Sequence, residues 1–124
     1  MALQIVEREW HGVTVLTLSG RVTIGEESSQ LRNKIRQLVG TGKTRLVLDL
    51  GDVSLIDSSG LGTLVSSFTT ATAQGGTIKL ANLTKRFSDQ LNITKLVTVF
   101  DVYNSAEEAV KSFASGDQVI RPRL

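Results

Sequence analysis

The residues best placed to do chemistry lie in one short segment, where an aspartate is followed by two serines. Asp57, Ser58 and Ser59 stand just before Gly60, between an apolar stretch and a stretch with helical spacing. The first turn of a helix favours added negative charge, because its backbone N–H groups have no partners within the helix. The segment therefore presents a serine hydroxyl where an added negative charge is favoured. A purely structural strand-to-helix turn explains the same residues equally well.

Catalysis would need further groups that converge on this segment. Asp49 lies in an apolar stretch, Asp52 in the expected loop after it, and Asp57 beside the expected helix cap. The chain has no cysteine, and its single histidine, His11, falls in a predicted turn. A response-regulator receiver, by its family pattern, needs an acidic pair after its first strand, and the sequence has none there. We therefore expect no enzymatic activity, no catalytic residue, no metal and no cofactor.

The elements that must position the serines are a strand and a helix. Residues 46–50 are almost wholly apolar, which is typical of a strand buried on both faces. Leu61, Leu64 and Phe68 recur at helical spacing and predict a helix over 59–74. Asp57 or Ser58 can cap this helix. Gly60 and Gly62 lack a Cβ atom, which allows another backbone or a partner surface to approach closely.

Strand and helix patterns alternate along the rest of the chain. Predicted strands cover 3–9, 13–18, 46–50, 77–82 and 97–100. The first predicted helix begins at a capping box formed by Thr23 and Glu26, and three further predicted helices cover 59–74, 83–91 and 106–113. The order predicts an α/β protein with a single mixed, mostly parallel sheet of about five strands and four helices. The first two strands, joined by a tight turn, should be antiparallel.

Composition limits the classes of partner. The 124 residues suffice for one domain, and the formal net charge is only +2, with the basic residues scattered. Nucleic-acid binding is therefore not expected. No apolar run approaches the roughly 20 residues of a membrane span, and the start of the chain lacks the pattern of a signal peptide. We expect a cytoplasmic protein that does not bind membranes.

The run Val53-Ser54-Leu55-Ile56 followed by Asp57-Ser58-Ser59-Gly60-Leu61-Gly62 resembles the signature of the STAS domain, and more narrowly that of anti-sigma-factor antagonists. The resemblance implies the STAS fold over 1–115, with a flexible tail over 116–124. It implies that an anti-sigma-factor serine kinase binds the unphosphorylated chain and phosphorylates Ser58, with Ser59 as the alternative. Phosphorylation would end the binding of this kinase, and a PPM-type serine phosphatase would remove the phosphate and so reset this switch. The partner-binding residues implied are Thr23, Asp57, Ser58, Ser59, Gly60, Leu61 and Gly62.

The sequence departs from this family at the edge of the expected site. Family members often carry acidic residues where this chain has Arg21 and Thr23. The kinase therefore either has a differently charged surface or does not regulate this chain. The alternative is a stressosome-type or other STAS scaffold without the switch. We expect a monomer or a weak dimer.

Overall fold

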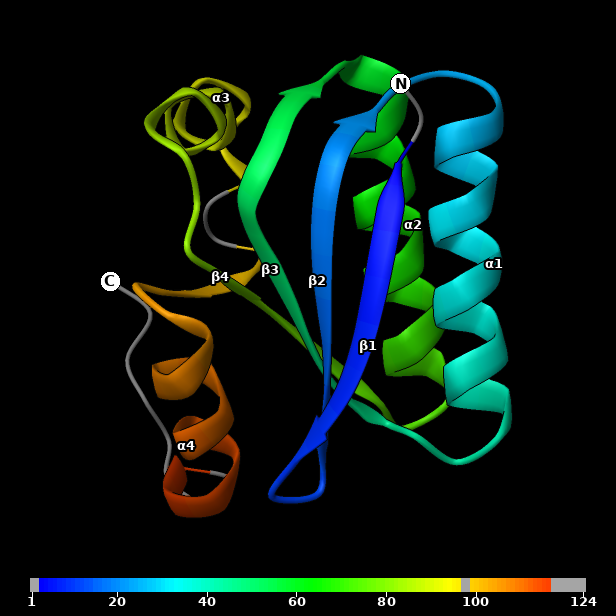
Figure 1. Cartoon of the computed structure of the whole chain (residues 1–124), viewed down its shortest axis with the longest axis vertical. Helices are drawn as coiled ribbons and strands as arrows, with labels where there is room; N and C mark the ends of the chain where they lie inside the picture. Colours follow the sequence, from blue (N-terminus) through cyan, green and yellow to red (C-terminus); the bar gives the residue numbers. More distant parts are fainter. Residues whose placement is uncertain (1–2, 97–98, 117–124) are drawn as a thin grey trace.

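The computed structural model describes residues 3–96 and 99–116, which form one sheet with helices packed against it (Figure 1). The elements in chain order are β1 (Gln4–Trp10), β2 (Val13–Val22), α1 (Glu26–Gly40), β3 (Arg45–Ile56), α2 (Ser58–Ala73), β4 (Thr77–Ala81), α3 (Lys85–Thr94), β5 (Asp101–Tyr103) and α4 (Ala106–Gly116). The predicted order of strands and helices is confirmed.

The sheet is mixed, as predicted. Over the described residues its five strands run in the order β1-β2-β3-β4-β5. Strand β1 is antiparallel to β2, and every other neighbouring pair is parallel. His11 and Gly12 join β1 to β2 with φ angles of 54° and 78°. Positive φ at both central residues is the requirement of a tight type I′ hairpin, which explains the antiparallel first pair.

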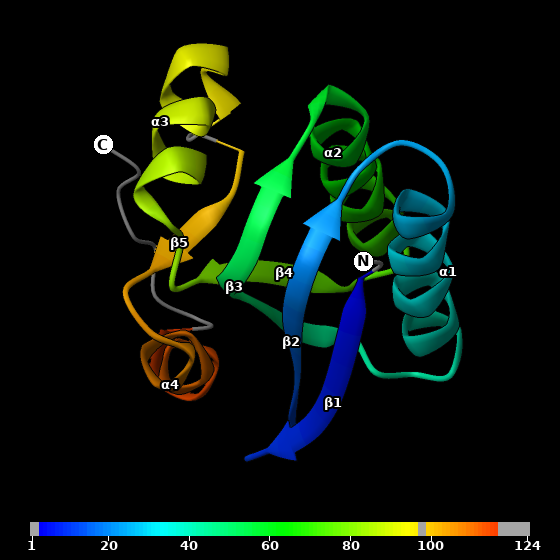
Figure 2. The same ribbon diagram turned by 45° about the horizontal axis from the view of Figure 1, so that its top comes forward.

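Two apolar cores lie on the two faces of the sheet. Alternate residues of β3 serve both: Leu46 and Leu48 belong to the core under α1 and α2, and Val47 belongs to the core under α4. Figures 1 and 2 show α1 and α2 side by side on one face and α4 on the opposite face. Helix α3 lies at the carboxyl end of β3, where its Phe87 and Leu91 join the larger core. Strand β3 is thus held in the middle of the molecule, and the chain that leaves it enters α2.

Helix α4 covers a buried lysine in the smaller core. Lys79 of β4 is only 6% exposed. Its Nζ donates a hydrogen bond to Ser112 Oγ at 2.7 Å and lies 4.1 Å from the centre of the Phe113 ring. Burial of an ammonium group is unfavourable without such partners, so these contacts help to fix α4 on the sheet.

The strands differ from their predicted bounds, most of all β3, β5 and β2, which extends to Val22 rather than to residue 18. Strand β3 extends to Ile56, so Asp52 lies in the strand rather than in a loop. The fifth strand is Asp101–Tyr103 and not 97–100: Val99 and Phe100 form a turn, and residues 97 and 98 lie outside the described residues. The apolar residue at position 100 does not indicate a strand. The Phe100 side chain is instead buried in the core, where its ring centre lies 5.4 Å from that of Phe68.

Predicted helix ends also differ from the observed ones, at α1, at α4 and at both ends of α3, which spans Lys85–Thr94 rather than 83–91. Helix α1 is preceded by Gly25, with no side-chain cap, because the chain turns at a positive φ of 99° there. Thr23 instead donates from its hydroxyl to Glu27 Oε1 at 3.3 Å, so it does not form the predicted capping box. Helix α4 includes Gly116, which was predicted to begin the tail. The remaining tail, 117–124, lies outside the described residues.

Side chains cap the starts of α3 and α4. Thr84 caps α3 by accepting from the Phe87 N–H at 3.2 Å. Ser105 accepts from the Glu108 N–H at 3.1 Å at the start of α4.

No helix in the described ranges combines the length and apolarity required to cross a bilayer.

Candidate functional site

Asp57 ties together the two loops that meet at the carboxyl end of the sheet. Its Oδ1 accepts from the Gly60 N–H at 2.8 Å, which caps α2, and its Oδ2 accepts from the Ile24 N–H at 3.0 Å, in the loop before α1. These bonds, first from Gly60 and then from Ile24, hold the pKa of Asp57 below its ordinary value. The carboxylate is therefore charged at neutral pH and serves as the cap. Of the two residues that the sequence offered for this role, Asp57 performs it.

Gly60 lets the first turn of α2 lie directly against the end of β2. A Cβ atom at this position would overlap the backbone carbonyl of Val22. The same carbonyl accepts from the Asp57 N–H at 3.3 Å. Gly60 is buried by its own chain, so its lack of a side chain serves packing. Gly62 is different, because it is exposed and a Cβ atom there would meet no atom within 4 Å.

The two serines differ in exposure. Ser58 is the first residue of α2 and is exposed, whereas Ser59 is half-buried. Within the described residues the Ser58 hydroxyl has no hydrogen-bond partner, because Asp57 provides the cap. An enzyme that approaches from solvent therefore reaches Ser58 more easily than Ser59.

The structure brings all the predicted partner-binding residues to one end of the molecule, at different depths. Ser58 and Gly62 are exposed; Thr23, Asp57 and Ser59 are half-buried; Gly60 and Leu61 are buried. Leu61 belongs to the apolar core, and only 7% of it is exposed. The surface that a partner can touch is therefore smaller than the predicted set of residues.

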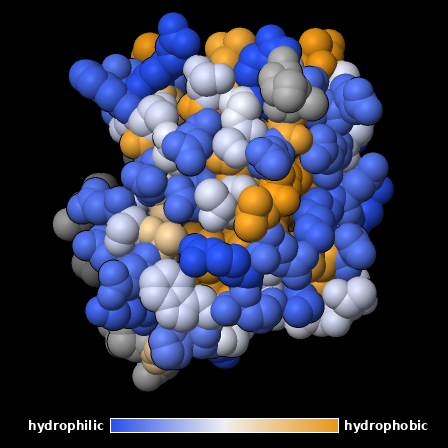
Figure 3. Space-filling model, in the orientation of Figure 1, coloured by the Kyte–Doolittle hydropathy of each residue, from blue (hydrophilic) through white to orange (hydrophobic). Residues whose placement is uncertain are grey.

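Ile24 belongs to this surface and was not predicted. It is 74% exposed, although its backbone is fixed by the bond to Asp57. Figure 3 shows small hydrophobic areas among hydrophilic residues along the upper edge of the molecule. The sequence did contain a signal for this exposed residue: an isoleucine stands between Thr23 and Gly25, in a loop, where an apolar side chain is not needed for the core.

The other carboxylates do not converge with Asp57. Asp49 Oδ1 accepts from the Gly51 N–H at 3.1 Å and from Asn82 Nδ2 at 3.2 Å, so it stabilises the irregular stretch of β3. Asp52 is exposed on the strand. In the described part of the chain, no three acidic, histidine or cysteine side chains are grouped so as to hold a metal ion.

The hydroxyl-rich face of α2 is only partly a surface. Among its serines and threonines, Thr63 and Ser67 are buried, whereas Ser66 and Thr69 are exposed. The Ser67 hydroxyl has no hydrogen-bond partner within the described residues.

The family model of the STAS domain matches residues 4–109 of this chain, which include the sheet and the serine turn. The chain belongs to the STAS domain family. It is 38% identical over 81 residues to the anti-sigma-B factor antagonist of Bacillus subtilis (strain 168), a match that covers 65% of this chain and 73% of that protein. The predicted family is therefore confirmed.

Solved structures share the fold at lower identity. An anti-sigma factor antagonist from Mycobacterium paratuberculosis is 23% identical, with a TM-score of 0.73 over 90% of this chain and 93% of that one. The Bacillus cell fate determinant SpoIIAA in its phosphorylated form is also 23% identical, with a TM-score of 0.70 over 90% of this chain and 99% of that one. The predicted STAS fold is confirmed, with five strands and four helices in residues 3–96 and 99–116.

Proposed function

We propose that this chain is an anti-sigma-factor antagonist controlled by phosphorylation of Ser58. The unphosphorylated form binds an anti-sigma-factor serine kinase and so releases the sigma factor. Phosphorylation of Ser58 by that kinase ends the binding, and a PPM-type serine phosphatase restores it. The chain acts as ligand and substrate in the cytoplasm, and the kinase supplies the ATP chemistry.

The observation that carries this proposal is that Asp57, and not Ser58, caps α2, which leaves the Ser58 hydroxyl exposed. Asp57 caps α2 and holds the neighbouring loop, so the turn does not depend on the hydroxyl of Ser58. Ser58 is exposed at the start of the helix. A phosphate can therefore be added and removed there without breaking a contact that holds the fold.

The same position explains how a phosphate could control docking. A phosphate on Ser58 would add a charge of about −1.5 to −2 to a surface where Asp57 is already ionised. The backbone N–H groups at the start of α2 favour this charge while water surrounds it. A partner that covers Ser58 would have to remove the water, so the energetic cost falls on the complex and not on the isolated domain.

The relatives support the proposal at two levels. The Bacillus subtilis relative is named an anti-sigma-B factor antagonist, which supports the class of partner. SpoIIAA has been solved in unphosphorylated and phosphorylated forms, and both share this fold, with TM-scores of 0.69 and 0.70. The second point supports the expectation that a phosphate leaves a domain of this architecture folded.

Substitutions at Ser58 test the switch. We expect Ser58→Ala to bind the anti-sigma-factor kinase as the unmodified chain does but to take up no phosphate from ATP. We expect Ser58→Asp to bind at least about tenfold more weakly, because a charge must be desolvated at the interface. Binding is measured by isothermal titration calorimetry and phosphate transfer by mass spectrometry.

Matched substitutions elsewhere on α2 serve as controls. Ser66 is exposed on the same helix, so Ser66→Asp should bind normally if position matters and charge alone does not. Ser59→Ala should still be phosphorylated, whereas loss of labelling in this variant would favour Ser59 as the acceptor. Binding of Ser58→Asp as tight as that of the unmodified chain would refute the switch. A stable assembly of the chain alone, detected by light scattering, would favour the scaffold alternative.

A further inference from the structure

Two arginines flank an exposed leucine beside the serine turn. Arg21 of β2 and Leu55 of β3 are direct neighbours in the parallel register, one pair before the strands end at Val22 and Ile56. Arg21 is exposed, and Leu55 is 39% exposed. Because cross-strand neighbours project from the same face, a partner that touches Leu55 also meets the guanidinium group of Arg21.

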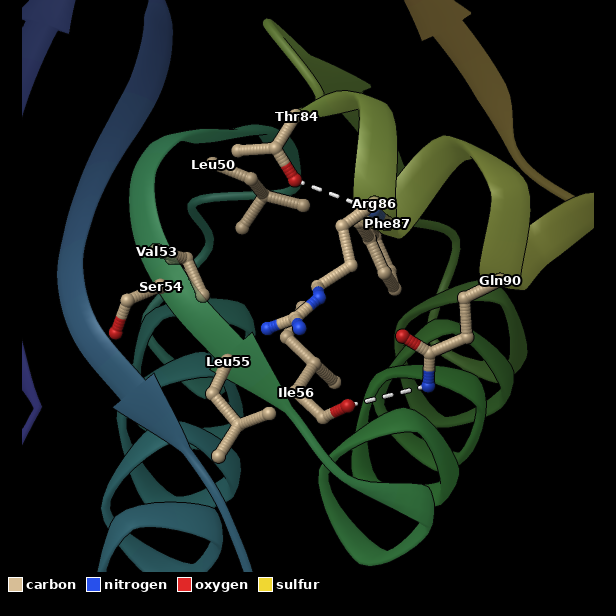
Figure 4. A pocket seen from close by; sticks show the side chains of 9 residues that line it. All are labelled: Leu50, Val53, Ser54, Leu55, Ile56, Thr84, Arg86, Phe87 and Gln90. Carbon is tan, nitrogen blue, oxygen red and sulfur yellow. Dashed lines mark hydrogen bonds between the residues drawn. The ribbon is translucent and has the colours of Figure 1, made fainter.

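The second arginine, Arg86 of α3, lines a hollow that the same leucine also lines. Leu55 lines a shallow hollow between the end of β3 and α3, with Val53, Ile56 and Phe87 as apolar neighbours. Figure 4 shows the Arg86 side chain extending from α3 toward β3, across this hollow.

Helix α3 is fixed next to the serine turn. Gln90 Nε2 donates to the Ile56 carbonyl at 3.1 Å, one residue before Asp57. The hollow is therefore a fixed part of the same end of the molecule, and its shallowness suits a partner side chain.

The positive charge of the two arginines is not neutralised within the described residues. Neither Arg21 nor Arg86 forms an ion pair there, whereas the neighbouring Lys85 pairs with Asp89 at 3.2 Å. Asp52 is exposed on β3, where it is opposite Ser19 in register, and it makes no ion pair with Arg21. On the other side, Glu27 is engaged by the Thr23 hydroxyl.

We propose that the docking face of the anti-sigma-factor kinase is acidic and that Arg21 and Arg86 recognise its carboxylates on either side of Leu55. This inference rests on the proposed function and adds the chemistry of the partner. A second copy of the chain fits the face poorly, because a symmetric contact would bring the arginines of both copies together. Two arginines are also far fewer than the cations with which proteins usually hold nucleic acid.

An acidic partner strengthens the effect of the phosphate. A phosphoserine at position 58 would then face carboxylates of the kinase, so that repulsion adds to the cost of removing water. The exposed leucine would supply the apolar contact at the centre, while the arginines mainly govern approach. The two kinds of contact can therefore be separated by kinetics.

Charge reversal tests this inference. In the unphosphorylated full chain, we expect Arg21→Glu combined with Arg86→Glu to lower the association rate with the kinase by about tenfold or more, with a smaller change in dissociation. Association of the unmodified chain should slow as salt rises, and that dependence should be reduced in the double variant. The control is Arg36→Glu, an equal charge change per site at an exposed position of α1. Surface plasmon resonance at several salt concentrations gives both rates.

The outcomes distinguish a failure of this inference alone from a failure of the proposed switch. Suppose that the unmodified chain binds the kinase, that Ser58→Asp weakens this binding, and that the double variant associates as fast as Arg36→Glu. The proposal of an acidic docking face on the kinase is then wrong, while the phosphorylation switch stands. If the unmodified chain does not bind the kinase, both proposals fail. A change in the mass of the chain alone upon charge reversal, measured by light scattering, would assign the face to a second copy and overturn the inference. Unchanged circular dichroism of the double variant confirms that it is folded.

Discussion

Two glycines in the first turns of α2 have opposite surroundings. Gly60 lies against the carbonyl of Val22, whereas Gly62 faces open space. The sequence offers the same reason for both, since each lacks a Cβ atom. Only the packing of α2 against β2 shows that one glycine is required by the fold and the other is available to a partner.

The pair gives a direct test of this difference. We expect Gly60→Ala to destabilise the chain by about 1–3 kcal/mol, because the methyl group must displace the end of β2. We expect Gly62→Ala to leave the stability unchanged or to raise it by up to about 1 kcal/mol, because alanine favours the helix. Urea unfolding of both variants measures the two changes. Equal effects would contradict the packing described for Gly60.

The charge of Asp57 predicts a dependence on pH. Its pKa is lowered by the N–H groups of Gly60 and Ile24, so the ionised carboxylate stabilises the fold above about pH 3.9, the ordinary value for aspartate. This contribution is lost as the pH falls through the lowered pKa of the folded state. Asp57→Asn keeps one accepting oxygen, but it loses the charge and the acceptor for either the Gly60 or the Ile24 N–H. We therefore expect it to be less stable than the unmodified chain at pH 7, with a smaller difference in acid, where the charge of Asp57 is also lost.

Urea unfolding of both chains over a series of pH values measures this difference. Other carboxylates, such as Glu9, occur in both chains, so their effects cancel in the comparison. A difference that stays constant from neutral pH into acid would show that the charge of Asp57 is not the cause.

Helix α2 shows how a polar sequence can fill a buried position. Its serines and threonines predict a solvated face, yet Thr63 and Ser67 are buried. Leu61 and Leu64 on the same helix face the larger core, as the helical spacing predicts. Sequence periodicity identifies the apolar side of the helix correctly but does not show that a second side is covered by a neighbouring element.

Ser67 offers a test of that burial. Its hydroxyl is buried without a hydrogen-bond partner among the described residues, which is unfavourable. We expect Ser67→Ala to raise the free energy of unfolding by about 1 kcal/mol. Ser66→Ala, at an exposed position, should change it by less than about 0.5 kcal/mol. Thermal and urea unfolding provide the measurement, and a less stable Ser67→Ala chain would show that the hydroxyl has a partner.

The ends of the elements were predicted less well than their order. The apolar residues 99 and 100 suggested a strand, but they pack in the core as a turn, and the edge strand β5 follows them. The helix at α1 starts after Gly25 because the loop before it is held by Asp57, 33 residues away in sequence. A contact over that separation leaves no local pattern.

At the scale of the whole molecule, sequence patterns were enough for the class of fold and for the serine turn. Alternating strand and helix patterns, with a tight turn first, predict the mixed sheet that is observed. That Arg86 and Leu55 line the same hollow could not be predicted, because it depends on where α3 lies relative to β3. The serine turn and Arg21 were therefore identified from the sequence, whereas the position of Arg86 beside them follows from the tertiary structure.

The hairpin at His11 and Gly12 lies at the opposite end of β2 from the serine turn (Figure 1). The ten residues of β2, at about 3.3 Å each, separate the two by roughly 30 Å. A dye or an affinity peptide inserted in this hairpin would stay clear of a bound kinase. The fold thus provides an attachment point from which every immobilised copy of the chain presents Ser58 outward in the same orientation.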